Sequence, residues 1–147
     1  MRILWLDNDV NYLMPYVGAL KAEGFEVTVV RSVGEAAFRL ADPNGGRYNL
    51  LILDVMIPSK NESEEADYTP EETGHGYRTG LVFYRRRKKE LAEAGTKVLV
   101  LTVMLGGEVL NDFIAEGLPA ENYATKYSLR AMPTFRRRIR SILYGMG

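Results

Sequence analysis

The sequence predicts an α/β fold in which a five-stranded parallel sheet lies between helices. Three unbroken apolar runs carry most of this prediction, at residues 3–6, 50–53 and 98–101. Runs of this length are what parallel strands buried on both faces require. Helical patterns separate the runs along the chain, and strands that alternate with helices favour a parallel sheet covered on both sides.

The first strand and helix have clear local signals. The strand is expected over about 2–7, and the helix runs from Asp9, a candidate N-cap, to Gly24, which suits a helix C-terminus. Pro15 lies inside this helix, so we expect either a kink there or a late start. The second strand follows at 25–30.

The second helix opens at Ser32, which forms a capping box with Glu35, and it ends before the turn-rich stretch 42–46. The third strand covers 49–54. The later elements alternate in the same way: a helix over about 80–94, a strand over 97–102, a helix over about 107–116, a strand over 123–125 and a last helix that begins near Arg130 or Pro133.

The stretch between Pro58 and Gly80 interrupts this alternation. It is rich in acidic residues and has neither a helical nor a strand period. Loops this long are uncommon inside a domain. We interpret residues 59–79 as an acidic loop insertion that leaves the third strand just after Asp54, with a lid or a docking surface as the alternative to a solvated loop.

The composition limits the classes of function. The 147 residues are enough for one domain with a core, and 19 Lys and Arg residues balance 19 Asp and Glu residues. A balanced charge gives no overall attraction to nucleic acid or membranes. The chain has no cysteine, no signal-peptide pattern and no apolar run of membrane-spanning length, so we expect a cytoplasmic protein.

Polar residues follow four of the expected strands: Asp7, Asp54, Thr102 and Lys126. In an open α/β sheet, ligands bind beyond the carboxyl ends of the strands. Two neighbouring carboxylates favour a bound cation such as Mg²⁺, and the hydroxyl and ammonium supply donors for an anionic oxygen cluster. Together these residues predict a phosphoryl-transfer site.

These segments resemble the receiver domain of two-component response regulators, over nearly the whole chain apart from the insertion. The matching segments are Ile-Leu-Trp-Leu-Asp7-Asn8-Asp9, Leu-Ile-Leu-Asp54-Val-Met-Ile-Pro58, Thr79-Gly80-Leu81, Val-Leu-Thr102 and Tyr123-Ala-Thr-Lys126. The resemblance implies a flavodoxin-like fold with strand order 2-1-3-4-5. It also implies that a histidine kinase phosphorylates the aspartate after the third strand, which would be Asp54.

The resemblance implies roles for the neighbouring residues as well. Mg²⁺ would be held by Asp7, Asn8, Asp54 and the backbone carbonyl of Met56, the phosphoryl group would be contacted by Thr102 and Lys126, and Thr102 and Tyr123 would form the conformational switch. The phosphoryl donor would be a sensor histidine kinase or a phosphotransfer protein.

No output domain follows the last helix, so we expect a stand-alone receiver that signals to a downstream protein effector by contact. In receiver-like proteins the face formed by the fourth helix, fifth strand and fifth helix contacts partners. A homodimer through that face is a further expectation.

Several positions depart from the family pattern. Asn8 stands where the family usually has an acid, so we expect Mg²⁺ binding in the millimolar range or weaker. Tyr127 stands where the family has a proline after a cis bond, and we expect a trans bond here. Val103 is larger than the usual residue, and with Met56 and Met104 it is expected to impede the attacking water and prolong the phosphorylated state.

Two alternatives stay open. The same fold can serve as a phosphorylation-independent binding module, a pseudo-receiver, and Asn8, Tyr127 and the insertion favour this interpretation. The segment Asp7-Asn8-Asp9 also fits the Asp-x-Asp motif of haloacid-dehalogenase-like phosphatases, with Asp7 as nucleophile. That family needs a further acidic pair after the lysine, whereas no Asp or Glu follows Glu121.

Two basic clusters and one histidine do not change the prediction. Residues 85–89 and 136–140 are rich in Arg and Lys, but a helix spreads consecutive side chains around its axis, so we do not expect nucleic-acid binding. Within the first cluster we expect Arg86 to pair with Glu90. His75, the only histidine, lacks the partners of a metal site and is expected in a loop.

Overall fold

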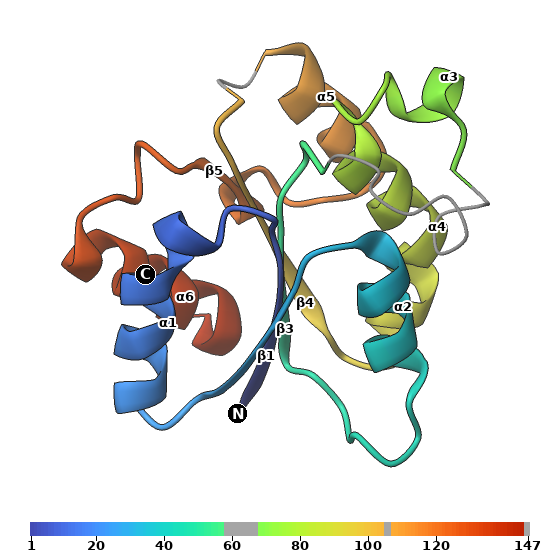
Figure 1. The fold of residues 1–147 in the computed structure, drawn as a ribbon. Coiled ribbons are helices and arrows are strands. Elements are labelled where there is room, and N and C mark those ends of the chain that lie inside the picture. The colour runs from blue at the N-terminus through green and yellow to red at the C-terminus, as the bar shows by residue number, and fades with distance from the viewer. Residues whose placement is uncertain (58–67, 105–106, 146–147) are drawn as a thin grey trace.

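A parallel five-stranded sheet forms the centre of the computed structural model, which describes residues 1–57, 68–104 and 107–145 (Figure 1). The strand order is β2-β1-β3-β4-β5, and each neighbouring pair is parallel. The strands are β1 (Arg2–Leu6), β2 (Glu26–Val30), β3 (Leu50–Leu53), β4 (Lys97–Thr102) and β5 (Tyr123–Thr125). The predicted fold class and strand order are confirmed.

Helices cover both faces of the sheet (Figure 1). One face carries α1 (Val10–Ala22) and α6 (Met132–Tyr144), and the other carries α2 (Val33–Ala41), α4 (Thr79–Glu93) and α5 (Glu108–Ala115). A short helix, α3 (Pro70–Thr73), contacts α4, and a 3₁₀ turn, η1 (Ala120–Asn122), leads into β5.

Two separate apolar clusters pack these layers. One contains Leu4, Leu51 and Phe113, and the other contains Trp5 and Phe135. Neighbouring residues of a strand belong to opposite clusters, because successive side chains of a strand point to opposite faces. The continuous apolar runs of the sequence therefore reflect central strands that are covered on both sides.

Pro15 predicted either a kink in α1 or a late start of this helix, and the structure bears on the second outcome. Asp9 caps the helix by accepting a hydrogen bond from the Tyr12 backbone N–H at 3.3 Å, and the helix begins at once with Val10. A late start is therefore wrong. Pro15 lies on the exposed side of α1, where water can reach the carbonyl that proline leaves without an N–H partner.

The predicted insertion is only partly covered by the structure, since the stretch 59–67 lies outside the described residues. Its described part contains a short helix, α3, which sequence reasoning missed. Thr69 caps α3 by accepting from the Glu72 N–H at 3.1 Å, and Gly74 ends it with a φ of 61°. Thr followed by Pro and two Glu residues is a helix-start signal, but one turn is too short to give a period.

The N-terminus of α4 packs directly against the end of β3. The Gly80 N–H donates to the Val55 carbonyl at 2.9 Å, and the Thr79 hydroxyl donates to the Ile57 carbonyl at 2.9 Å. A Cβ atom at Gly80 would lie 2.1 Å from the backbone oxygen of Asp54, so only glycine permits this approach. The contact fixes the backbone on which the Asp54 side chain sits.

In the part of the chain that the structure describes, every helix is too short or too polar to cross a membrane.

Candidate functional site

The polar residues after four of the strands lie together at the carboxyl edge of the sheet. β1 pairs with β3, β3 with β4 and β4 with β5, which sets Asp7, Asp54, Thr102 and Lys126 side by side in that order. All four are buried, with exposed fractions of 0%, 4%, 0% and 6%. The structure thus brings together the four side chains that the sequence singled out.

Lys126 forms an ion pair with both carboxylates. Its Nζ atom lies 2.8 Å from Oδ2 of Asp7 and 3.5 Å from Oδ2 of Asp54. The Asp7 contact is close but lacks the direction of a hydrogen bond. The Lys126 backbone N–H donates to the Thr102 carbonyl at 2.8 Å, which ties the start of the β5–α6 loop to the end of β4.

Backbone groups hold the other oxygen of each carboxylate. Oδ1 of Asp7 accepts from the Asp9 N–H at 2.8 Å, and Oδ1 of Asp54 accepts from the Val55 N–H at 2.8 Å. The Thr102 hydroxyl also hydrogen-bonds to the Asp54 carboxylate. Both side chains therefore have fixed orientations.

The electrostatics of this cluster favour an additional positive charge. Burial, and then the charge of Asp7, raise the pKa of Asp54 to about 6, although Lys126 and the Thr102 hydrogen bond act in the opposite direction. Among the residues that the structure describes, two buried carboxylates thus face a single buried ammonium. Such an excess of negative charge is the setting in which a site takes up a cation.

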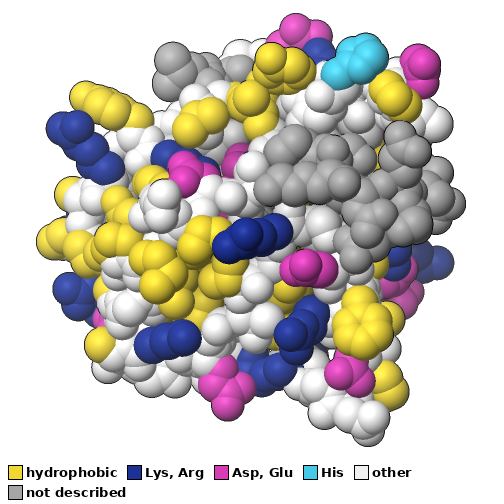
Figure 2. Space-filling model, in the orientation of Figure 1, with side chains coloured by type: hydrophobic (Ala, Val, Ile, Leu, Met, Phe, Trp, Pro, Cys, Tyr) yellow, Lys and Arg dark blue, Asp and Glu magenta, His cyan; other side chains and the backbone are white. Residues whose placement is uncertain are grey.

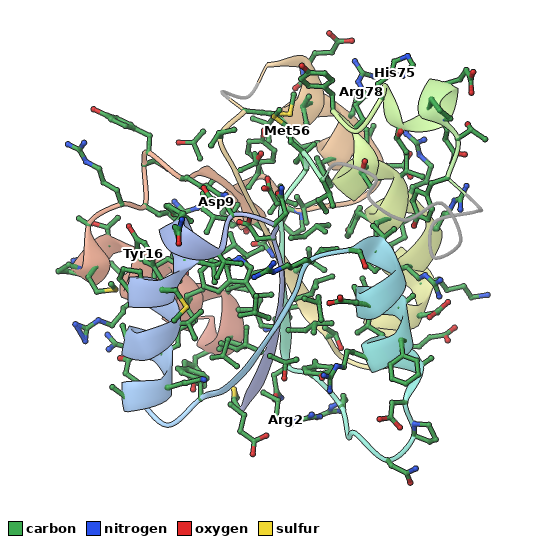
Figure 3. All side chains as sticks on the ribbon, viewed as in Figure 1. Arg2, Asp9, Tyr16, Met56, His75 and Arg78 are labelled. Carbon is green, nitrogen blue, oxygen red and sulfur yellow. The ribbon has the colours of Figure 1, made fainter. Side chains whose placement is uncertain are left out.

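A cavity of about 410 Å³ opens over Asp54. Figure 3 shows Asp9, Met56 and His75 at this edge of the molecule, with Arg2 at the opposite edge. Asp7 does not line the cavity, so Asp54 is the reachable carboxylate of the buried pair. The lining residues are Asn8, Asp9, Asp54, Met56, His75, Gly76, Tyr77, Val103 and Lys126.

The predicted magnesium ligands are compatible with an oxygen-coordinated cation. Asn8 and Met56 line the same cavity as Asp54, and Asp7 contacts Lys126, which also lines it. Two carboxylates, an amide and a backbone carbonyl are ligands that Mg²⁺ accepts. Among residues 1–57, 68–104 and 107–145, however, no cluster of three or more Asp, Glu, His or Cys side chains forms a metal site.

A larger cavity, of about 620 Å³, lies at the other end of β4. It is lined by Lys97, Leu118 and Ile142 among others and contains none of the four polar residues. The candidate site is therefore chosen by the chemistry of the cavity lining and not by the size of the cavity.

The predicted switch residues are close to each other. Tyr123 is buried, its hydroxyl donates to the Met104 carbonyl at 3.0 Å, and its ring packs against Phe113 at 6.0 Å. The Met104 N–H in turn approaches the Thr102 hydroxyl oxygen at 3.4 Å. Thr102 and Tyr123 are thus joined through Met104.

The departures from the family pattern have simple structural outcomes. The described residues contain no cis peptide bond, so the bond before Tyr127 is trans, as expected. Tyr127 is 70% exposed and its ring lies 4.8 Å from the Arg130 guanidinium. Val103 is also exposed, at the rim of the cavity.

His75 lies in a loop, as expected, but sequence reasoning did not place it beside the Asp54 cavity. His75 has a φ of 58° and stands between Gly74 and Gly76, which also have positive φ values. Figure 2 shows the histidine side chain on the molecular surface, and the residue belongs to the rim of the Asp54 cavity. The two flanking glycines were the only sequence signal for this tight turn.

The expected pairing of Arg86 differs in the structure. Arg86 contacts both carboxylate oxygens of Glu72, at 2.7 and 2.9 Å, and lies 4.3 Å from the Tyr68 ring, while Glu90 pairs with Arg87 at 3.3 Å. Both contacts come from one guanidinium nitrogen, Nη2, and both are shorter than the contact of Arg87 with Glu90. They anchor α3 to α4.

Sequence reasoning also missed Tyr12, whose ring centroid lies 4.6 Å from Lys126 Nζ. Its position in the first turn of α1, three residues after the Asp9 cap, was the available signal, since that turn adjoins the carboxyl edge of β1.

Comparisons with known proteins identify the fold. Protein-family models and curated proteins gave no match to this chain. Among solved structures, it is similar to the BeF₃-activated receiver domain of Klebsiella pneumoniae RstA, with 16% identity, coverage of 98% of this chain and 99% of that one, and a TM-score of 0.71.

Two further structures agree. A CheY-like receiver domain protein from Methanospirillum hungatei JF-1 has 20% identity, coverage of 97% and 92%, and a TM-score of 0.71. A two-component response regulator from Clostridium difficile has 14% identity, coverage of 97% and 95%, and a TM-score of 0.72. The chain therefore has the CheY-like receiver fold of response regulators, and at these identities the likeness defines the fold alone.

Proposed function

We propose that this chain is a response-regulator receiver that accepts a phosphoryl group on Asp54 in the presence of Mg²⁺. One observation carries the proposal: Asp54 is almost fully buried yet faces a cavity, with Lys126 and Thr102 directed at its carboxylate. A nucleophile held beside a cation and a hydroxyl donor is what phosphoryl transfer requires.

The chemistry is a displacement at phosphorus. A carboxylate oxygen of Asp54 forms a bond to phosphorus while the P–N bond of a phosphohistidine donor breaks and its imidazole leaves. Lys126 then neutralises the acyl phosphate, and the Thr102 hydroxyl turns from Asp54 to donate to a phosphoryl oxygen. Mg²⁺, held by Asp7, Asn8, Asp54 and the Met56 carbonyl, would neutralise the charge of the phosphoryl oxygens.

The partners follow from this chemistry. The donor would be a sensor histidine kinase or a phosphotransfer protein, and the signal would pass to a protein effector by contact. Movement of Thr102 toward the phosphoryl group would be transmitted through Met104 to Tyr123, because these residues are linked by hydrogen bonds.

The test is incubation with Mg²⁺ and acetyl phosphate, followed by measurement of the intact protein mass. The wild type should gain one phosphoryl group, the isosteric variant Asp54→Asn should gain none, and Lys126→Met should react more slowly. Circular dichroism of each variant checks that it is folded. Met56 and Val103 line the cavity and support a long-lived adduct; a lifetime of seconds would count against that expectation.

One observation favours the pseudo-receiver as a second candidate. Lys126 already lies 2.8 Å from Asp7, and Asn8 supplies no charge to a metal site, so the site is partly neutralised without Mg²⁺. Absence of any mass gain in the wild type would support this candidate. A phosphatase with Asp7 as nucleophile would instead be inactivated by Asp7→Asn and not by Asp54→Asn.

A further inference from the structure

The ammonium of Lys126 has an aromatic neighbour in addition to its two carboxylates. Its Nζ atom lies 4.6 Å from the centroid of the Tyr12 ring, while Asp7 and Asp54 approach the same atom at 2.8 and 3.5 Å. A cation within about 6 Å of an aromatic centroid is attracted by the ring. Lys126 is 6% exposed, so little water competes with this contact.

The Tyr12 ring is itself held in place by neighbouring aromatic residues. It stacks on Tyr16 with the centroids 5.1 Å apart and the planes at 28°, and the rings of Tyr16 and Phe135 meet edge to face with their centroids 4.9 Å apart. Phe135 packs on Trp5 at 5.8 Å in the core. Because the stack reaches from the core to the site, Tyr12 presents a ring of fixed position.

The same pair of tyrosines also reaches the loop that follows β5. The Tyr16 hydroxyl donates to the Arg130 carbonyl at 2.7 Å, four residues beyond Lys126. Both the side chain of Lys126 and the loop after it are therefore attached to α1. Burial raises the pKa of Tyr12, so its ring remains a neutral phenol beside the ammonium.

We propose that Tyr12 is a positioning residue that holds the Lys126 ammonium between Asp7 and Asp54 through a cation–π contact. A lysine side chain has four flexible bonds, and two carboxylates alone leave it free to move between them. The ring closes the remaining side and fixes the positive charge where an incoming phosphoryl group meets it. This consequence for phosphoryl binding rests on the function proposed above, whereas the contact itself does not.

The contact is tested first by NMR, without any phosphoryl ligand. The ring current of Tyr12 should shift the ε-methylene protons of Lys126 upfield, and Lys126→Met assigns the signal by its loss. The shift should persist in Tyr12→Phe and disappear in Tyr12→Leu. Tyr127→Leu is the matched control, since that ring is exposed and lies over Arg130; it should leave the signal in place.

The functional consequence is tested by titration with beryllofluoride, a phosphoryl mimic, in saturating Mg²⁺. Tyr12→Leu should weaken binding by roughly two- to thirtyfold, the range of a desolvated cation–π contact, and Tyr12→Phe should restore it. In a Lys126→Met background, Tyr12→Leu should have almost no further effect, because the partner is already absent.

The outcomes separate the two proposals. An unshifted Lys126 signal in the wild type, or the same loss of affinity with and without Lys126, would overturn the positioning role. A wild type that shows the NMR shift but binds no beryllofluoride would refute the phosphoacceptor function and leave the contact established.

Discussion

Three buried charged residues, Asp7, Asp54 and Lys126, define the site at the scale of single residues. Their exposed fractions are 6% or less, so each charge depends on its protein neighbours rather than on water. Removing one member of a buried ion pair commonly costs about 3–5 kcal/mol because the other charge is left unpaired. The two carboxylates and one ammonium, when all are ionised, give the cluster a net negative charge that a bound cation would neutralise.

The raised pKa of Asp54 predicts a measurable pH dependence of stability. The pKa is about 6 in the folded protein against a usual value of 3.8, so between these values the folded chain retains a proton that the unfolded chain releases. Stability contributed by protonated Asp54 is therefore lost as the pH rises through this window. Asp54→Asn removes the titration, so the stability of this variant relative to the wild type should rise by about 1–3 kcal/mol from about pH 4 to pH 7, in addition to any pH-independent cost of removing the carboxylate.

Urea unfolding of both proteins across this pH range, with a chelator present, measures the difference. A constant difference between the wild type and Asp54→Asn would contradict the assigned direction of the pKa shift.

Asn8 predicts a weak magnesium site. A unit charge about 4 Å from a divalent metal ion is worth roughly 2–8 kcal/mol, depending on the local dielectric. The wild type should therefore bind Mg²⁺ in the millimolar range or weaker, and Asn8→Asp should tighten binding by at least about tenfold. Isothermal titration calorimetry gives both constants.

Asn111→Asp is the matched control for this experiment, since it adds the same charge at an exposed position of α5, outside the cavity. Tight binding by the wild type would mean that a further carboxylate, such as Asp9, joins the site.

At the scale of elements, the junctions between strands and helices determine where the site residues lie. β3 ends at Leu53, and α4 returns so closely that Gly80 contacts the Asp54 backbone. α1 begins two residues after Asn8 and brings its first turn to Lys126. The site is thus built from the ends of elements rather than from their interiors.

Gly80→Ala should therefore be strongly destabilising. The new Cβ would lie 2.1 Å from the Asp54 oxygen and 2.8 Å from the Val55 Cα, which forces α4 away from β3. We expect a loss of about 2–3 kcal/mol or more in the free energy of unfolding. Gly18→Ala is the matched control, because its Cβ meets open space in a helix and should stabilise by about 0.5–1 kcal/mol.

Chemical denaturation of the two variants checks this prediction. Equal stabilities would show that α4 can shift without cost and that Gly80 is not fixed by the close approach.

Local signals explain which elements the sequence could predict. Apolar runs identify the central strands, and the side chains of Asp9 and Ser32 cap α1 and α2 as expected. α3 was missed because a single turn has no period. The contacts of Arg86 with Glu72 and of Lys126 with Tyr12 were missed, because the packing of helices brings these residues together.

At the scale of the whole molecule, the sheet separates two apolar clusters (Figure 1). The polar residues of the candidate site lie outside both clusters, at the carboxyl edge of the sheet. The order of the strands was predictable only through the resemblance to receivers, since apolar runs do not specify which strands are neighbours. The roles of the site residues stay predictions, as does a homodimer through α5, β5 and α6. Because a fold of this kind serves more than one function, the function must be argued from the chemistry of the site residues.

The identity of the phosphorylated residue is the most direct test of the proposed function. Borohydride reduces an aspartyl phosphate to homoserine, so tandem mass spectrometry of a digest locates the acceptor after treatment with Mg²⁺ and acetyl phosphate. Phosphoryl acceptance by Asp54 predicts homoserine at position 54 and none in a sample without acetyl phosphate. Homoserine at position 7, or at no position, would contradict it.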